Sequence, residues 1–433
     1  MKVQKRKIGN YQQLYITLPA KICQAMDIEK GTDILISVAG KDSLLLKVIS
    51  KVIIIIMVGN NRRNIYMAHE ERVKLYEKIE EKRGRPLISY FTNLRANASA
   101  QMASDVIPEF AKQILEIPKE QKEVDILIVS YGGDPTVAWR IISMLRERFE
   151  KVSVLVPYAA YSAATLLALG ANEILMHPFS NLGPVDPQLA YKDKEGKIQQ
   201  FGYEDLRLYL DFVKGDVGIS DQEQLERAFE LVCKDIGSIP IGVAKRSSYL
   251  ALSMGEKLLS LHMKDQNKVK AIAEALNKSF YYHGYPVGRK EAKKVGLPVK
   301  NPDEELENLM WLVWNDVEEE MECNKPFDPL GIVLSDEKTA KLIGNVPQVQ
   351  MPINLPPQIL QQAINDILNK IEVIQVEPID YELISASIES TRCISEFKVK
   401  GKISAARLPD MNIAVNVVKT ESGWRFHKIK KEE

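Results

Sequence analysis

Apolar and polar positions alternate along the middle of the chain with two periods, one typical of strands and one typical of helices. The pattern predicts strands at 86–91, 124–130, 152–157 and 173–176, and helices at 102–116, 137–149 and 163–170. Repeated strand-helix succession indicates an α/β fold with a mostly parallel sheet and right-handed crossovers. Ligands of such folds bind at the carboxyl ends of the strands, so the loops there are the first candidates for a site.

The segments on either side of this α/β region show other spacings of apolar residues. Residues 1–58 read as short strands around one helix at 19–26, and 70–84 as a charged helix that Gly84 ends. From 203 to 320 apolar residues recur mostly with the spacing of a helix, most clearly at 221–235, 238–263 and 266–279. Residues 372–433 alternate with period two, which predicts a β-rich region with turns at Gly401 and at 421–423.

A chain of 433 residues is too long for one ordinary core, and the patterns suggest where it divides. The stretch 345–358 holds four prolines and few charges, which predicts a linker before a short helix at 357–371. We expect an N-terminal β domain at 1–58, an α/β core at 66–325, a linker and helix at 326–371, and a C-terminal β-rich domain at 372–433.

Composition narrows the class of protein. With 58 basic and 58 acidic residues, no overall charge draws the chain toward nucleic acid or anionic lipid. The four cysteines form no CxxC pair and the histidines have no HExxH spacing, so we expect no metal, no cofactor and a reducing, cytoplasmic setting. The longest apolar run, 52–58, is about a third of the length that a membrane-spanning helix needs, and we expect no membrane span.

Two turns follow apolar strands where a parallel sheet presents its ligand-binding edge. At the first, Gly132 and Gly133 have no Cβ, so their backbone N–H groups are open to a substrate carbonyl. At the second, Ser162 begins a helix of small residues, whose N-terminus favours developing negative charge. Each signal is common by itself, but together they suggest a serine nucleophile beside an oxyanion hole.

Residues 70–300 resemble the serine dehydrogenase proteinase family, relatives of the Clp protease subunit and of signal peptide peptidase A within the Clp/crotonase fold. The motifs that carry this resemblance are 74–91 (KLYEKIEEKRGRPLISYF), the strand before Gly132-Gly133, 161–176 (YSAATLLALGANEILM), 180–188 (SNLGPVDPQ), 283–287 (HGYPV) and 291–298 (EAKKVGLP). The resemblance implies a Clp/crotonase-like core and an ATP-independent serine peptidase that takes peptide or protein substrates. It further implies Ser162 as the nucleophile, with the N–H groups of Gly133 and Ala163 as oxyanion donors.

A serine hydroxyl needs a base, and the sequence leaves two candidates. Lys245 lies on an otherwise apolar stripe of a predicted helix, where partial desolvation would favour its neutral form. Alternatively, its aliphatic chain extends along the surface and its ammonium group stays in solvent. The other candidate is His283 with Asp186, which stand near the positions of the Clp triad aspartate and histidine with the two types exchanged. A triad is defined by geometry and not by chain order, although Asp186 could equally cap a turn and His283 could be a packed residue.

One departure from the family pattern bears on activity. The family usually has a glycine soon after the serine, whereas Ala163 and Ala164 follow Ser162 here, and an extra methyl group there could crowd the acyl intermediate. Two functions therefore stay open: a serine peptidase, or a catalytically silent scaffold that binds DNA or a partner.

The first 48 residues resemble an AbrB-type swapped-hairpin domain. The resemblance rests on 6–9 (RKIG), 15–19 (YITLP), 26–28 (MDI) and 30–33 (KGTD). It implies that two chains interleave their hairpins, which would make the protein a homo-oligomer, and it allows DNA contact through a basic arm. Residues 1–58 carry nine Lys or Arg and four Asp or Glu, but the rest of the chain is not basic, so we favour assembly over DNA binding.

Overall fold

The computed structural model describes 65–192, 196–278, 280, 282–344, 356–368, 372–410 and 412–429, together with the backbone of four strands in the first 48 residues. Its contacts divide the chain into two compact units, 1–63 and 64–433. The described helices include none that is long and apolar enough to cross a membrane.

Two antiparallel hairpins form the described part of the first unit. Strands β1 (Val3–Ile8) and β2 (Tyr11–Ile16) make one hairpin, and β3 (Ile34–Gly40) and β4 (Ser43–Val48) make the other. The helix expected at 19–26 lies outside the described residues, as does the end of the strand expected at 44–58. The interleaving of two chains and the contact with DNA stay predictions.

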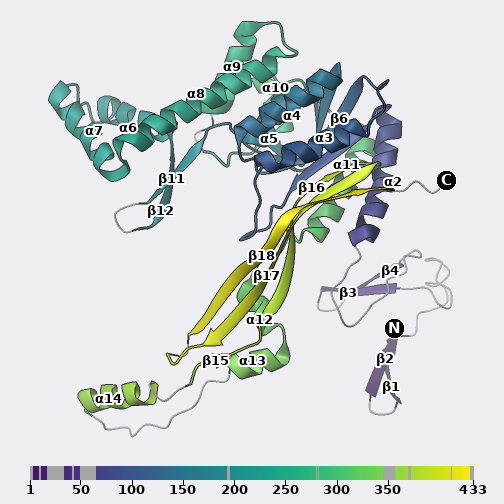
Figure 1. Ribbon diagram of the computed structural model, residues 1–433, viewed down its shortest axis with the longest axis vertical. Coiled ribbons are helices and arrows are strands. Elements are labelled where there is room, and N and C mark those ends of the chain that lie inside the picture. The colour runs from purple at the N-terminus through teal and green to yellow at the C-terminus, as the bar shows by residue number, and fades with distance from the viewer. Residues whose placement is uncertain are drawn as a thin grey trace. The chain divides into compact units, whose positions relative to one another are not determined.

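A nine-stranded sheet organises the second unit, with the order β14-β9-β7-β6-β5-β16-β17-β15 and β18 on the other edge of β17. Figure 1 labels β6 and the long strands β16, β17 and β18 of this sheet. Its first five strands are parallel: β14 (Val299–Lys300), β9 (Glu173–Met176), β7 (Lys151–Val156), β6 (Glu123–Val129) and β5 (Leu87–Thr92). The predicted α/β fold with a mostly parallel sheet is thus confirmed.

Helices cover both faces of the parallel strands, which is why those strands are apolar throughout instead of alternating. On β6, Ile126 and Ile128 pack into one core with α3 (Ile107–Leu115), α4 (Pro135–Arg148) and α5 (Ala163–Leu169). Leu127 and Val129 pack into the opposite core with α2 (Ile65–Arg83) and α11 (Glu304–Glu320). The sheet is therefore a central layer, and its strand ends hold the connecting loops in place.

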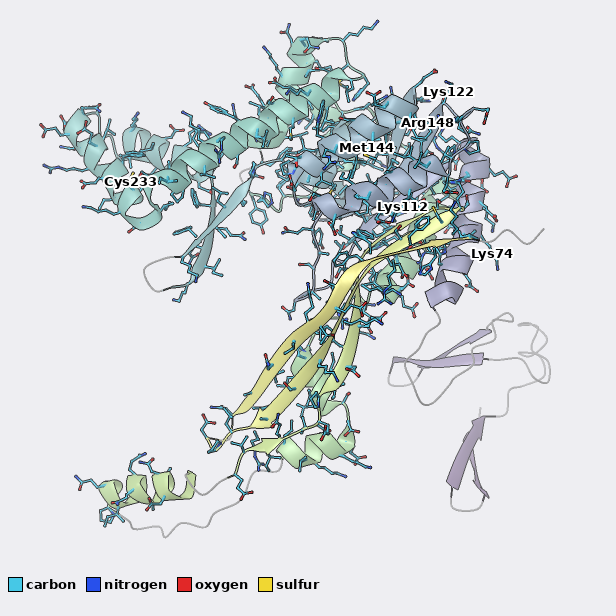
Figure 2. The ribbon with its side chains drawn as sticks, viewed as in Figure 1. Lys74, Lys112, Lys122, Met144, Arg148 and Cys233 are labelled. Atoms are coloured by element: carbon cyan, nitrogen blue, oxygen red, sulfur yellow. The ribbon has the colours of Figure 1, made fainter. Side chains whose placement is uncertain are left out.

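The C-terminal β-rich region continues the same sheet. Strand β16 (Ile379–Glu389) pairs antiparallel with β5, with Ile388 opposite Tyr90, and it is followed by β17 (Cys393–Arg407) and β18 (Ile413–Lys428). Lys112 of α3 is labelled in Figure 2. Its Nζ atom lies 5.1 Å from the ring centre of Phe426 on β18. Helix α3 therefore packs against this region as well as against the parallel strands.

The predicted turns at Gly401 and at 421–423 are wrong, because both segments lie inside long strands. Gly401 marks a shift in register between β17 and β18. A Cβ atom there would lie 2.2 Å from the Val418 carbonyl oxygen and 2.6 Å from Cε1 of Tyr381. The glycine thus permits a close backbone approach at a bulge and does not reverse the chain.

A helical segment precedes α10 (Arg289–Val295) in the chain. It consists of α6 (Tyr203–Gly215), α7 (Gln222–Ile236), α8 (Ser238–Ser260) and α9 (Gln266–Lys278). A hairpin of β11 (Gln188–Lys192) and β12 (Ile198–Gly202) precedes it. The remaining elements are η1 (Ser104–Val106), β8 (Ala159–Ala160), β10 (Asn181–Leu182), β13 (Val287–Gly288), α12 (Pro329–Leu334), α13 (Glu337–Gly344), α14 (Pro357–Leu368) and β15 (Ile374–Gln375).

Candidate active site

Ser162 stands at the N-terminus of α5, on a sharp turn between β8 and the helix. Its backbone has φ 51° and ψ −116°, a conformation that side-chain-bearing residues rarely adopt. Strain of this kind collects at functional sites, where the surrounding fold enforces it. The Ser162 side chain makes no capping hydrogen bond to α5, so its hydroxyl is not used in starting the helix.

The glycine loop after β6 is held on a neighbouring segment. The Met102 N–H donates to the Gly132 carbonyl oxygen at 2.8 Å, and the Asp134 N–H donates to the Met102 carbonyl oxygen at 2.9 Å. Gly132 has φ 94° and Gly133 has φ 150°, and a Cβ on Gly133 would lie 2.4 Å from the Met102 oxygen. Both positions therefore require glycine. Asp134 then caps α4 by accepting from the Thr136 N–H.

The glycine loop and the serine turn touch each other. A Cβ on Gly132 would lie 2.8 Å from the Ala163 nitrogen and 2.8 Å from Cβ of Ser162. Among the hydrogen bonds of the described residues, the Gly133 N–H has no acceptor. The Ala163 N–H belongs to the first residue of α5 and precedes the bonds within the helix. Each of the two turns that meet here thus carries one backbone N–H group without a hydrogen bond among the described residues.

Asp186 and His283 are in direct contact. The His283 Nδ1 atom lies 2.7 Å from Asp186 Oδ1, and the second carboxylate oxygen accepts from the Gln188 side chain at 3.1 Å. The hydrogen bond to Asp186 raises the pKa of His283, and this effect outweighs the partial burial of the ring. When Nδ1 donates to the carboxylate, Nε2 of the neutral ring is an acceptor that can take a proton.

Three short strands connect this pair to the serine turn. Strand β10 pairs in parallel with β8, so Asn181 lies opposite Ala159, and its other edge pairs with β13. The Thr165 hydroxyl in α5 donates to the Ala160 carbonyl oxygen at 2.7 Å and accepts from the Gly183 N–H at 3.0 Å. The segment that leads to Asp186 and the one that follows His283 are therefore both anchored beside Ser162.

Lys245 lies on α8 and is exposed to solvent in the single chain. Its Nζ atom lies 5.7 Å from the ring centre of Tyr249, whose surface is 56% exposed. Further along the expected apolar stripe, Leu259 is fully buried. The stripe thus enters the core only toward its C-terminal end, and Lys245 lies on its solvent part.

Sequence reasoning gave no role to Ser130 or to two tyrosines that flank the loops. The Tyr131 and Tyr161 rings stack at 5.6 Å with an angle of 16° between their planes, and Tyr131 remains 45% exposed. Ser130 is fully buried directly before the glycine loop. The available signal was its place, because a hydroxyl ends an otherwise apolar strand next to a functional turn.

Residues 38–200 match a family model described as ClpP-like SDH-type serine proteinase, which points to a ClpP-like serine protease. The matched segment contains Gly132, Gly133, Ser162 and Asp186 but neither Lys245 nor His283.

Two uncharacterised proteins of Methanocaldococcus jannaschii are similar to the chain. One is 30% identical over 207 residues, which is 47% of this chain and 63% of the relative, so the chain covers less than two thirds of that relative. The other is 25% identical over 237 residues, which is 53% of this chain and 71% of the relative. A solved structure of a mutant of the 1510-N membrane-bound stomatin-specific protease aligns at 17% identity with a TM-score of 0.32, over 48% of this chain and 78% of that one.

Proposed function

We propose that this chain is an ATP-independent serine peptidase that cleaves peptide bonds of peptide or protein substrates through an acyl-enzyme on Ser162. The observation that carries the proposal is the contact between the two turns. The strained Ser162 turn abuts Gly132, and the N–H groups of Gly133 and Ala163 have no hydrogen-bond acceptor among the described residues. A carbonyl bound there meets a nucleophile and two donors at once.

The reaction follows from these groups. The Ser162 hydroxyl oxygen bonds to the scissile carbonyl carbon while its proton passes to Nε2 of His283, and the oxyanion is held by the two N–H groups. Breaking the carbon–nitrogen bond releases the amine, which takes the proton from His283. Water then attacks the acyl-enzyme by the same route and frees the acid. Asp186 holds the His283 ring and stabilises its protonated form.

His283 is the better-supported base. It lies in contact with a carboxylate on a segment anchored beside Ser162, whereas Lys245 is exposed and lies over Tyr249. We therefore expect His283→Ala to lower the rate of Ser162 acylation by at least 100-fold and Lys245→Met to change it by less than about threefold.

The two alanines that follow Ser162 belong to the core of the protein. The side chains of Ala163 and Ala164 are buried in the core shared by α4, α5 and α8. Because these methyl groups are part of that core, we expect the departure from the usual glycine to be compatible with catalysis.

The direct test is labelling with a fluorophosphonate, which reacts with an activated serine. We expect the wild type to be labelled at Ser162 and to cleave casein, and we expect Ser162→Ala to lose both. Ser335→Ala, which changes an exposed serine far along the chain, is the matched control and should retain both. A folded wild type that takes no label and leaves casein intact would refute the proposal and favour a silent scaffold.

A further inference from the structure

We infer that Ser130 is the positioning residue that sets the spacing between the nucleophile and the oxyanion donors; this inference rests on the proposed function. Ser130 is fully buried and follows the last residue of β6. Its N–H donates to the Ala159 carbonyl oxygen at 2.9 Å, and its carbonyl oxygen accepts from the Tyr161 N–H at 2.9 Å. The backbone of Ser130 thus holds the segment that ends at Ser162.

The side chain of the same residue holds the other half of the site. The Ser130 Oγ atom accepts from the Gly132 N–H at 3.0 Å and from the Thr92 hydroxyl at 2.8 Å. Thr92 lies at the end of β5 and is only 1% exposed. One residue therefore bonds to the serine turn through its backbone and to the glycine loop through its hydroxyl, and Thr92 fixes the direction of that hydroxyl.

The bond to Gly132 also decides which amide faces the substrate. Glycine backbones have many accessible conformations, so a loop with two of them needs external restraints. Met102 holds the Gly132 carbonyl oxygen, and Ser130 holds the Gly132 N–H. The next amide along the chain, that of Gly133, is left to donate to the oxyanion. Without the Ser130 hydroxyl, the donor loses its fixed distance from Ser162.

Ser130→Ala tests this role because it keeps both backbone bonds and removes only the acceptor. We expect kcat for peptide cleavage and the rate of fluorophosphonate labelling to fall 10- to 100-fold, since misplacing one oxyanion donor acts on the transition state. KM should change by less than about twofold. Thr92→Val should lower the rate severalfold, and the conservative Thr92→Ser should retain it.

The matched control is Ser153→Ala, which removes another fully buried, hydrogen-bonded serine from the neighbouring strand β7. It should lower the melting temperature without changing the rates. Hydrogen–deuterium exchange gives a second readout: a peptide covering 126–134 should exchange faster in Ser130→Ala and unchanged in Ser153→Ala.

The possible outcomes distinguish the proposed peptidase function from the positioning role of Ser130. A wild type that takes no label removes the proposed function itself. If the wild type is labelled and Ser130→Ala is labelled equally fast, or if its glycine loop exchanges as slowly as in the wild type, the role of Ser130 is overturned alone. Should Ser130→Ala fail to fold, equal rates in Thr92→Val and Thr92→Ser overturn it instead.

Discussion

Asp186 and His283 are 97 residues apart in the sequence, yet Oδ1 of the first lies 2.7 Å from Nδ1 of the second. Their side chains are 20% and 40% exposed, so the pair lies at the surface of the site and solvent screens part of its interaction. The proposed base and the residue proposed to orient it are thus in direct contact.

Asp186→Asn should lower the pKa of His283, because it removes the carboxylate that raises it. An NMR titration of the His283 ring, assigned with His283→Gln, measures the shift.

A group whose pKa is raised by folding stabilises the protein fully below its unfolded pKa of about 6.5 and no longer does so above its folded pKa. The wild type should therefore exceed Asp186→Asn in melting temperature by more at pH 6 than at pH 9. Labelling of Ser162 should fall by about 10²- to 10⁴-fold. An unchanged pKa would show that the contact is absent in solution.

Gly132→Ala should destroy the site. The new Cβ would lie 2.5 Å from the Tyr161 carbonyl oxygen, in a backbone conformation with φ 94° that alanine rarely adopts. We expect a loss of about 1–3 kcal/mol in the free energy of unfolding and no labelling of Ser162. Gly242→Ala in α8 is the control, because its Cβ would meet nothing within 4 Å and alanine favours a helix by up to about 1 kcal/mol. Thermal unfolding and labelling of both variants decide the point, and a labelled Gly132→Ala would contradict the described contact of the turns.

A buried ion cluster joins α2, α11 and β16 and should make stability depend on pH. Arg72 donates to both carboxylate oxygens of Glu389 at 2.9 Å, and it lies 2.7 Å from Glu320. It also contacts Asp316, and the Tyr76 hydroxyl donates to Glu389 at 2.8 Å. Burial and the charge of Glu389 raise the pKa of Glu320 to about 7, against the opposing effect of Arg72. Burial also acts on Glu389, but Arg72 outweighs it and lowers the pKa of Glu389 to about 2.

The two carboxyl groups act in opposite pH ranges. Because folding raises the pKa of Glu320, its stabilising contribution is full below about pH 4.5 and is lost as the pH rises through 7. Because folding lowers the pKa of Glu389, its contribution is full above about pH 4.5 and is lost as the pH falls toward 2. Glu320→Gln should therefore gain melting temperature relative to the wild type between pH 5 and pH 8. Glu318→Gln on the same helix is the control, and parallel curves for Glu320→Gln and the wild type would contradict the prediction.

The N-terminal unit is expected to assemble chains and to bind DNA weakly at most. Light scattering after size exclusion should give a mass of two or more chains for the full-length protein, and a smaller assembly after deletion of 1–63, the unit that the contacts separate from the rest. A gel-shift assay over a salt series measures the DNA contact, because binding through the nine basic residues of 1–58 would weaken steeply with salt. Tight, steeply salt-dependent binding would reverse the order of these two functions.

The sequence by itself determined the elements of the core and the two turns. Strands and helices from 86 to 176 were predictable because both faces of the parallel sheet are covered, so a short apolar run has few alternatives. Gly132 and Gly133 were visible because the conformations they adopt restrict residue type locally, and Ser162 because it begins a helix of small residues. The prediction of turns at Gly401 and at 421–423 was wrong, because a glycine occurs both in turns and at bulges within strands and the sequence does not distinguish the two.

Only the tertiary structure decided which distant groups meet. The pairing of β16 with β5 joins segments about 300 residues apart, and no local pattern encodes which distant strand a strand pairs with. The sequence left both Lys245 and His283 open as candidate bases, and the fold left one on the solvent part of α8 and placed the other against Asp186. The contacts of Ser130 were decided in the same way. Its three bonding groups reach Ala159, Tyr161 and Gly132 because parallel strands bring their carboxyl ends to one edge of the sheet.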